Sequence, residues 1–347
     1  MRRRQILAVL LAAALALLAA AACGAQVRES GGGGGSQGGG GGKGANAPVR
    51  LAVVPRAIGF SFWEQVRLGA ECATKKAPGD VSMQWDGTTS EADVNGQVNI
   101  LQNFITQGVD GLVYSSIDEK VDAKVTKQAI QQGITVVNIN TGTDPQPSDI
   151  PLFTTNQVAA TRKAVDPLAQ AIGGKGKVAI IEFQPGLPAN EQRVNPLKEG
   201  LKQNYPDIDI VAEQSSGAEY NRALQVTEDI LTAHPDLDAI FAANEPSVLG
   251  AAEAVRGAGK VGDIVIVGWD ASSAEIKALK AGAIKALVAQ NPFRMGYEGV
   301  DAAVKIIRTG KKVESEDTGS FLITKDNVDD PKIQAVLHPS CENPPLK

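Results

Sequence analysis

The feature that most constrains the fold is a regular alternation of short apolar runs with amphipathic helical patterns from Val49 to Thr309. Short apolar runs indicate strands that are buried on both faces, as in parallel sheets covered by helices. Strands are expected at 49–54, 109–114, 134–139, 177–183, 208–211, 239–242, 264–267 and 286–289. Helices are expected at 62–75, 94–107, 121–132, 160–172, 190–204, 218–234, 247–257, 274–281 and 295–309. The alternation predicts an α/β protein.

The alternation restarts after residue 155, so the chain divides into two similar halves. At 347 residues, 43% of them hydrophobic, the chain is long enough to bury two separate cores. We therefore expect two doubly wound domains, each built on a parallel sheet with helices on both faces.

The first 48 residues have a different composition. Arg2, Arg3 and Arg4 precede an apolar stretch at 6–22 that ends at Cys23, which predicts an export signal over 1–23. A cysteine at this boundary is typical of a lipoprotein cleavage site, although Ala20 stands where a larger aliphatic residue is usual. Lipidation of Cys23, plain secretion and a short transmembrane helix are the alternatives, in that order. The glycine-rich segment 24–48 is expected to be a flexible tether.

Charge and residue content exclude several functions. With 34 basic and 39 acidic residues and no basic cluster, the chain is not expected to bind nucleic acid. The two histidines, His234 and His338, offer no acid–base pair, and no cysteine–histidine spacing suits a metal. The glycines at 173, 174 and 176 precede a strand and lack a nucleotide-binding spacing. We expect no enzyme activity, no cofactor and no metal.

Polar side chains follow three neighbouring apolar runs of the second half. Asn244 follows the run at 239–242, Trp269 and Asp270 follow the run at 264–267, and Gln290 follows the run at 286–289. Parallel sheets place ligands at the carboxyl ends of their strands. The sequence therefore predicts a crevice for a small molecule at this edge.

Three segments carry a resemblance to a known family: DILTAHPDLDAIFAAN at 229–244, VGWD at 267–270 and VAQNP at 288–292. With them, residues 51–321 resemble the periplasmic sugar-binding proteins of ABC transporters, of the ribose- and galactose-binding type. The resemblance implies the type I fold, in which two lobes joined by a three-segment hinge close over a ligand. It implies lobes at 49–155 with 291–321 and at 156–290 with 322–347, and crossings near Thr155, Gln290 and Phe321.

The resemblance also implies a set of ligand-binding residues. Aromatic side chains would enclose the apolar faces of a sugar ring, while charged and amide groups would bind its hydroxyls. The implied residues are Phe62, Trp63, Ser115, Asn140, Arg193, Asn244, Trp269, Asp270 and Gln290. Asn140, Thr141, Gln157 and Ala218 depart from the usual aspartate, arginine, amide and aromatic residue of the family. Ribose and galactose are therefore not assigned as the ligand.

The remaining cysteines, Cys72 and Cys341, would form a disulfide in an exported chain, or else stay as a buried and a free thiol. The predicted function is capture of a pentose, hexose, deoxysugar or polyol by a monomeric binding protein that delivers it to a membrane permease. The protein would be anchored by Cys23 to the outer face of the bacterial membrane, or be periplasmic. The alternative is a receptor that signals to a sensor kinase or chemoreceptor. A transcriptional repressor is disfavoured, because residues 1–48 leave no room for a helix-turn-helix.

Overall fold

The protein is described by a computed structural model that covers Gly44 and residues 47–345. The predicted export signal with Cys23, and all of the predicted tether except Gly44 and residues 47–48, lie outside the described residues. Within the described part, no helix is long and apolar enough to cross a membrane.

The first lobe is built on a six-stranded sheet with the strand order β11-β5-β4-β3-β1-β2, and all of its strand pairs are parallel. Its strands are β1 (Val49–Val54), β2 (Val81–Trp85), β3 (Gly111–Tyr114), β4 (Thr135–Ile139), β5 (Leu152–Thr154) and β11 (Glu316–Asp317). The strand order reverses between β1 and β3. A crevice forms at the carboxyl ends of the strands where the order of an open parallel sheet reverses.

The second lobe repeats this arrangement with the order β12-β10-β9-β8-β6-β7. Its strands are β6 (Lys175–Glu182), β7 (Asp207–Ser215), β8 (Ala239–Ala242), β9 (Val265–Trp269), β10 (Ala286–Gln290) and β12 (Ser320–Thr324). The order reverses between β6 and β8. The edge strand β12 runs antiparallel to β10, whereas the other pairs are parallel.

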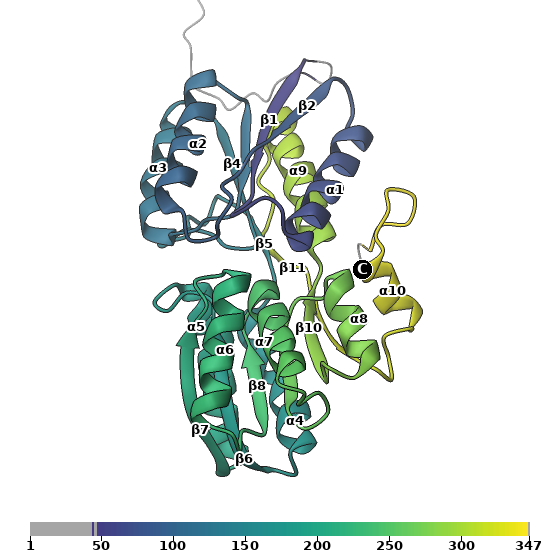
Figure 1. Ribbon diagram of the computed structural model, residues 1–347. Coiled ribbons are helices and arrows are strands. Elements are labelled where there is room, and N and C mark those ends of the chain that lie inside the picture. Colours follow the sequence, from purple (N-terminus) through teal and green to yellow (C-terminus); the bar gives the residue numbers. More distant parts are fainter. Residues whose placement is uncertain (1–43, 45–46, 346–347) are drawn as a thin grey trace, which may run out of the picture. The chain divides into compact units, whose positions relative to one another are not determined.

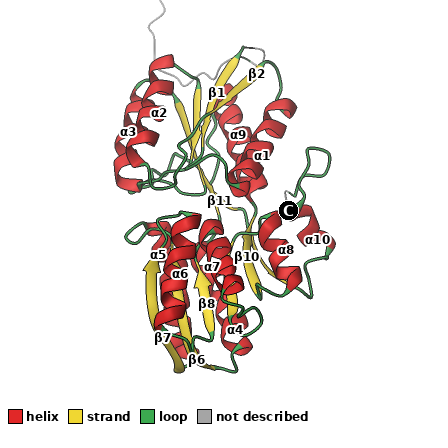
Figure 2. Ribbon diagram, in the orientation of Figure 1, coloured by secondary structure: helices red, strands yellow, loops and turns green. Residues whose placement is uncertain are grey.

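Helices cover both faces of the first sheet, as Figures 1 and 2 show. One face packs on α2 (Val94–Gln107) and α3 (Glu119–Gln131), through a core that includes Leu101, Ile105 and Val125. The other face packs on α1 (Ser61–Lys76) and α9 (Pro292–Thr309).

Two glycines let α1 and α9 approach closely. A Cβ atom at Gly69 would overlap the carbonyl oxygen of Phe293, and one at Gly296 would overlap that of Val66. α1 starts after β1 of the first sheet, and α9 starts where the chain leaves β10 of the second sheet. The close packing of the two helices therefore fixes these starting points relative to each other.

Helices also cover both faces of the second sheet. One face packs on α4 (Gln157–Ala171) and α5 (Pro188–Asn204). The other packs on α6 (Tyr220–Ala233), α7 (Glu245–Gly257), α8 (Ser273–Ala281) and α10 (Pro331–Leu337). Strand residues alternate between these two cores: Val267 and Val288 face α4 and α5, whereas Ile266 and Leu287 face the opposite side.

The predicted fold class, two doubly wound α/β domains, is confirmed. The elements that the sequence pattern missed are β2, β5, β11, β12 and α10. β5 and β11 have three and two residues, too few to show a period. β2 is a half-exposed edge strand that carries Ser82 and Gln84 among its apolar residues. The antiparallel β12 corrects the expectation of a purely parallel second sheet.

The chain passes between the two sheets in three places. It leaves the first sheet after β5, returns to the first lobe after β10, and crosses again between β11 and β12. Ser320 and Phe321, which the resemblance places in the first lobe, pair with Gln290 and Ala289 of the second sheet. Cys72 of α1 and Cys341 form a disulfide, with their Cα atoms 5.3 Å apart.

Candidate functional site

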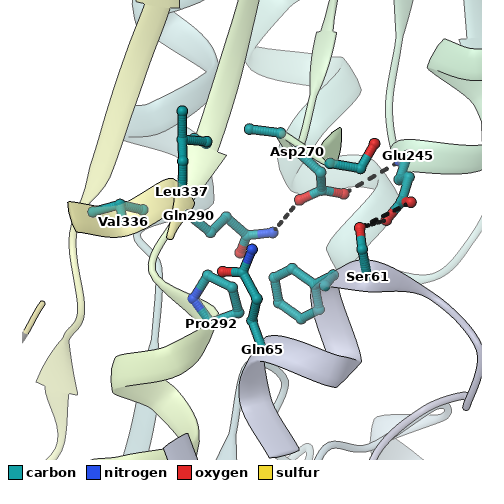
Figure 3. A pocket seen from close by; sticks show the side chains of 12 residues that line it. Ser61, Gln65, Glu245, Asp270, Gln290, Pro292, Val336 and Leu337 are labelled. Carbon is teal, nitrogen blue, oxygen red and sulfur yellow. Dashed lines mark hydrogen bonds between the residues drawn. The ribbon is translucent and has the colours of Figure 1, made fainter. Parts of the chain in front are cut away.

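Two adjoining pockets lie where the carboxyl ends of strands from both sheets meet. The first has about 350 Å³ of empty space, including its opening, and is lined by Arg56, Phe60, Phe62, Trp63, Glu91, Asn140, Arg193, Asn244, Glu245, Pro246, Asp270 and Gln290. The second, of about 320 Å³, shares Phe62, Glu245, Asp270 and Gln290 with it. Because the two share these walls, we treat them as one crevice with a main pocket and a side pocket. Figure 3 shows the side pocket, which α10 closes with Val336 and Leu337.

The strand ends of the second lobe hold an acid and an amide in fixed positions. Asp270 follows β9, and Gln290 ends the neighbouring strand β10. The Gln290 Nε2 atom donates to Asp270 Oδ1 at 2.8 Å, and the backbone N–H of Glu245 donates to Asp270 Oδ2 at 3.2 Å (Figure 3). Burial raises the pKa of Asp270 above its usual range, while the Arg193 guanidinium opposes the shift. The carboxylate is therefore oriented before any ligand arrives.

Arg193 projects from α5 and is 5% exposed. Its Nε atom donates to Gln157 Oε1 at 2.7 Å, and Nη1 donates to the Ala243 carbonyl oxygen at 2.9 Å. The same Nη1 lies 4.0 Å from Asp270 Oδ2. Burial lowers the pKa of Arg193, and the charge of Asp270 opposes this. Anchored in this way, the guanidinium can present its remaining N–H groups to a ligand.

Trp269, which the resemblance implies as an aromatic wall for the ligand, does not line either pocket. Its ring is fully buried in the core under α4 and α5, with the Arg193 Cζ atom 4.1 Å from the ring centroid. Its indole N–H has no hydrogen-bond partner among the described residues. Trp269 therefore supports the guanidinium from behind. The aromatic side chains that line these two pockets all come from the first lobe.

The aromatic side chains of the crevice come from the start of α1. Phe62 and Trp63 both line the main pocket, and their rings meet edge to face with centroids 4.8 Å apart. Trp63 is 1% exposed, and its indole N–H donates to Glu91 Oε1 at 2.8 Å. The more accessible apolar surface therefore belongs to Phe62 and to Phe60, which precedes the helix.

Asn140 follows β4 and contacts the second lobe. Its Nδ2 atom lies 3.4 Å from Gln290 Oε1, and its Oδ1 atom accepts from Thr141 Oγ1 at 3.1 Å and from Ser115 Oγ at 3.4 Å. Its φ of 58° lies in the left-handed region, which asparagine tolerates better than most residues. Ser115 is buried behind Asn140 and does not line the pocket, so the structure places it as a support.

Asn244 combines a helix cap with a free donor. Its Oδ1 atom accepts from the backbone N–H of Ser247 at 3.1 Å and from Ser247 Oγ at 2.5 Å, which caps α7. The Nδ2 atom is buried and has no hydrogen-bond partner among the described residues. Because Asn244 lines the main pocket, this donor is available to a ligand oxygen.

Glu245 links the two lobes and was not predicted from the sequence. Both of its carboxylate oxygens lie 3.1 Å from Ser61 Oγ at the start of α1 (Figure 3). Burial, with the nearby charge of Asp270, raises the pKa of Glu245 to about 7. The sequence signal for this residue was weak, because an acid at the first position of a helix is common without any functional role. Arg56 and Glu91 were missed as well, since both lie in loops that have no periodic pattern.

The described residues contain no group of three or more histidine, cysteine, aspartate or glutamate side chains that could hold a metal ion. His234 and His338 follow the last residues of α6 and α10, and neither lines the crevice. The crevice thus offers acceptors, donors and an aromatic wall, a set that suits recognition of a small polyhydroxylated molecule.

Comparison with known proteins gives consistent matches. The profile of the periplasmic binding protein domain matches residues 51–312. The chain is 30% identical to a D-ribose/D-allose-binding protein of Pseudomonas aeruginosa, over 78% of this chain and 85% of the relative. It is 28% identical to a D-allose-binding periplasmic protein of Escherichia coli, over 80% and 90% of the two chains. Among solved structures, a carbohydrate transporter solute-binding protein from Agrobacterium radiobacter in complex with D-arabinose has a TM-score of 0.79 at 31% identity, covering 84% of this chain and 99% of that one.

Proposed function

This chain belongs to the periplasmic binding protein domain family, and from that premise we propose that it captures a sugar or sugar-like solute for an ABC importer. Its relatives are binding proteins of ABC transporters, and the chain is a binding protein rather than an enzyme. Members of this family are exported to the periplasm. The proposal concerns the solute itself, the way it is bound and the route by which it is delivered.

The observation that carries the proposal is the arrangement of polar groups at the strand ends of the second lobe. Asp270, Gln290, Arg193 and Asn244 line one pocket and are held by their own hydrogen bonds. A carboxylate accepts from two hydroxyl groups, and a guanidinium and an amide donate to their oxygens. Phe62 supplies a flat apolar surface for the C–H face of a ring.

The proposed ligand class is a pentose, hexose, deoxysugar or polyol. D-arabinose and D-fucose are bound in similar solute-binding proteins from Agrobacterium radiobacter and Agrobacterium vitis. Asn140 stands where the family usually has an aspartate, and an amide both donates and accepts hydrogen bonds. The ligand hydroxyl groups that the first lobe can bind at this position therefore differ from those that an aspartate would bind. The ligand therefore need not be one of these sugars, but it should share their size and their hydroxyl content.

Binding would proceed by closure of the first lobe onto the second. The contacts between the lobes identify the groups that meet on closure: Asn140 with Gln290, and Ser61 with Glu245. A ligand that contacts both sides favours the closed form, because it adds contacts that only this form makes. The closed protein would then deliver its solute to a membrane permease. A lipid on Cys23, joined to the body by the predicted tether, would keep the protein near that permease, and we propose that it acts as a monomer.

Titration calorimetry on the mature protein with D-ribose, D-allose, D-arabinose, D-fucose, inositols and linear polyols tests the proposal. We expect a micromolar or tighter dissociation constant for one or a few stereoisomers, and a matching rise in melting temperature. The control is Asp270→Asn, which should lose most of the binding. A complete lack of response to the panel would contradict the sugar assignment.

A further inference from the structure

Two charged side chains of the first lobe, Arg56 and Glu91, line the main pocket. Neither is among the ligand-binding residues that the resemblance implied. Arg56 follows β1, and Glu91 lies in the loop between β2 and α2. We propose that Arg56 and Glu91 form a specificity pair, in which Arg56 donates to ligand hydroxyl groups and Glu91 accepts from them. The proposal rests on the function proposed above and identifies which part of the first lobe selects the ligand.

Arg56 is buried without the partners that a buried guanidinium usually has. It is 3% exposed and forms no ion pair within 4.0 Å among the described residues. Its Nη2 atom has one long contact, 3.5 Å to the backbone oxygen of Glu91, and its Nε atom has no hydrogen-bond partner. Burial of an unpaired charge costs free energy that some other contact must offset. A ligand in the pocket that Arg56 lines would supply the missing acceptors.

The two guanidinium groups of the main pocket, those of Arg56 and Arg193, differ in how firmly hydrogen bonds hold them. Arg193 is anchored by Gln157 and the Ala243 carbonyl group and faces Asp270, whereas Arg56 has no comparable anchor. Both guanidinium carbons lie over the ring of Phe183, at 5.5 Å for Arg56 and 5.4 Å for Arg193. Like charges that approach on closure repel each other, and oxygen acceptors that the two groups share relieve this repulsion.

Glu91 is the acceptor of the pair. Its Oε1 atom is held by the Trp63 indole N–H at 2.8 Å, and its Oε2 atom has no hydrogen bond to any described residue. Its charge contributes to the raised pKa values of Asp270 and Glu245, so it faces carboxylates that belong to the second lobe. A carboxylate that is fixed on one oxygen and open on the other can accept from a ligand hydroxyl with little loss of side-chain entropy.

The carboxyl end of β4 does not supply charge to this side of the crevice. Asn140 and Thr141, the first two residues after β4, are uncharged, so the charged recognition of the first lobe comes from Arg56 and Glu91. These residues lie after β1 and β2 rather than after β4. The ligand should therefore carry adjacent hydroxyl groups on the edge that faces these two loops, and analogues without one of them should be rejected.

The test compares Arg56→Met and Glu91→Gln with a matched control, Arg67→Met. Arg67 is also a first-lobe arginine, but its side chain is 45% exposed and it lies outside both pockets. Affinities for D-ribose, D-allose, D-arabinose and D-fucose are measured by calorimetry on the mature protein. For the sugar that binds the parent best, we expect about 30-fold weaker binding in Arg56→Met and about tenfold in Glu91→Gln. Arg67→Met should bind like the parent.

Melting temperatures without ligand give a second readout that does not depend on which sugar binds. Methionine is about as long as the arginine stem up to Nε, so it keeps the apolar stem and removes the unpaired charge, and Arg56→Met should melt at the parent temperature or above it. A fall of about 5 °C or more would show that Arg56 holds the fold together, and would overturn the proposal. Unchanged sugar affinity in Arg56→Met would overturn it too. If no sugar of the panel binds the parent, the proposed function fails, and the melting temperatures still decide whether Arg56 is structural.

Discussion

The two lobes share a topology but contribute different chemistry to the crevice. The second lobe provides Asp270, Gln290, Arg193 and Asn244, each held by hydrogen bonds within that lobe. The first lobe provides the aromatic wall and polar groups, two of which make long contacts: Asn140 lies 3.4 Å from Gln290, and Arg56 lies 3.5 Å from the backbone oxygen of Glu91. The second lobe is therefore the preorganised half of the site, and the first lobe completes it.

This difference indicates an order of events. A ligand that docks on the second lobe meets groups already in position, so little entropy is lost on binding. In the proposed mechanism, closure of the first lobe would then add the aromatic surface and remove water from the polar contacts. Substitutions in the second lobe should accordingly weaken the initial binding, while substitutions in the first lobe should mainly speed release.

The largest effect is expected for Asp270→Asn. Asparagine keeps the shape of the side chain and tolerates the φ of 76° at this position, but it loses the charge and one acceptor. We expect about 100-fold weaker binding or more, since hydrogen bonds to a charged group contribute most. Calorimetry measures the affinity, and circular dichroism checks that the fold is intact. Parent-like binding in this variant would remove the basis for calling the second lobe the preorganised half.

The next largest effect is expected for Arg193→Lys. A lysine keeps the charge but cannot bond Gln157 and the Ala243 carbonyl group at once while also facing the pocket. Binding should weaken by about 10- to 100-fold. The control is Lys198→Arg on the same helix, where the side chain pairs with Glu213 at the surface. Equal affinities in Arg193→Lys and the parent would mean that charge alone matters at this position.

A smaller effect is expected for Phe62→Leu in the first lobe. Leucine preserves much of the apolar volume and removes the flat face that would cover a sugar ring, so binding should weaken by about tenfold or less. Stopped-flow measurements should place this loss mainly in the dissociation rate. An effect confined to the association rate would contradict the proposed order of docking and closure.

The smallest effect concerns pH. In the closed protein the pKa of Glu245 is raised to about 7 by burial, and Asp270 and Glu91 add to the shift, while Ser61 and the Phe62 N–H oppose it. When the lobes open, water reaches this carboxyl group and its pKa falls back toward the usual range. Closure therefore takes up a proton, and closed-form stability that is present at low pH is lost as pH rises through about 7.

Affinity for a neutral sugar should accordingly fall a few-fold as the pH rises from about 5.5 to 8.5. If the closed form held a carboxylate paired with a cation instead, the pKa of that carboxylate would be lowered and affinity would rise with pH. Glu245→Gln cannot titrate, so it should lose this part of the pH dependence. Calorimetry at three pH values measures both proteins. If the parent and Glu245→Gln showed the same pH dependence of affinity, a group other than Glu245 would be responsible for it.

The sequence pattern predicted the fold class and most of the polar groups of the second lobe. Asn244 and Gln290 could be identified because each follows or ends an apolar run whose parallel neighbours end at the same edge. The orientation of Trp269 could also have been found. It has the same parity in β9 as Val267, a core residue, so the alternation of the strand directs its ring into the core.

The first-lobe groups were harder to predict for a physical reason. Arg56 and Glu91 lie in loops of different lengths, and they meet in the pocket only because the strand order places β1 next to β2. Loop conformation has no short period that a sequence could reveal. The contact of Glu245 with Ser61 joins residues that are 184 positions apart, and it depends on how the lobes close.

The disulfide between Cys72 and Cys341 joins residues that are 269 positions apart in the chain. It joins α1 of the first lobe to the tail that follows α10, whose Ile333 and Val336 are buried. Beyond it, the Pro345 carbonyl oxygen accepts from Asn291 Nδ2 at 2.6 Å, at the point where the chain leaves β10. The disulfide thus ties a helix of the first lobe to a tail that packs against the second lobe.

Because a disulfide needs its two Cα atoms within about 7 Å of each other, this bond forms only when α1 and the tail lie side by side. Oxidation of the pair therefore records that α1 and the tail after α10 have come together. A mixture of reduced and oxidised protein, separated on a non-reducing gel, would report what fraction of the molecules has reached this arrangement, without any measurement of ligand binding.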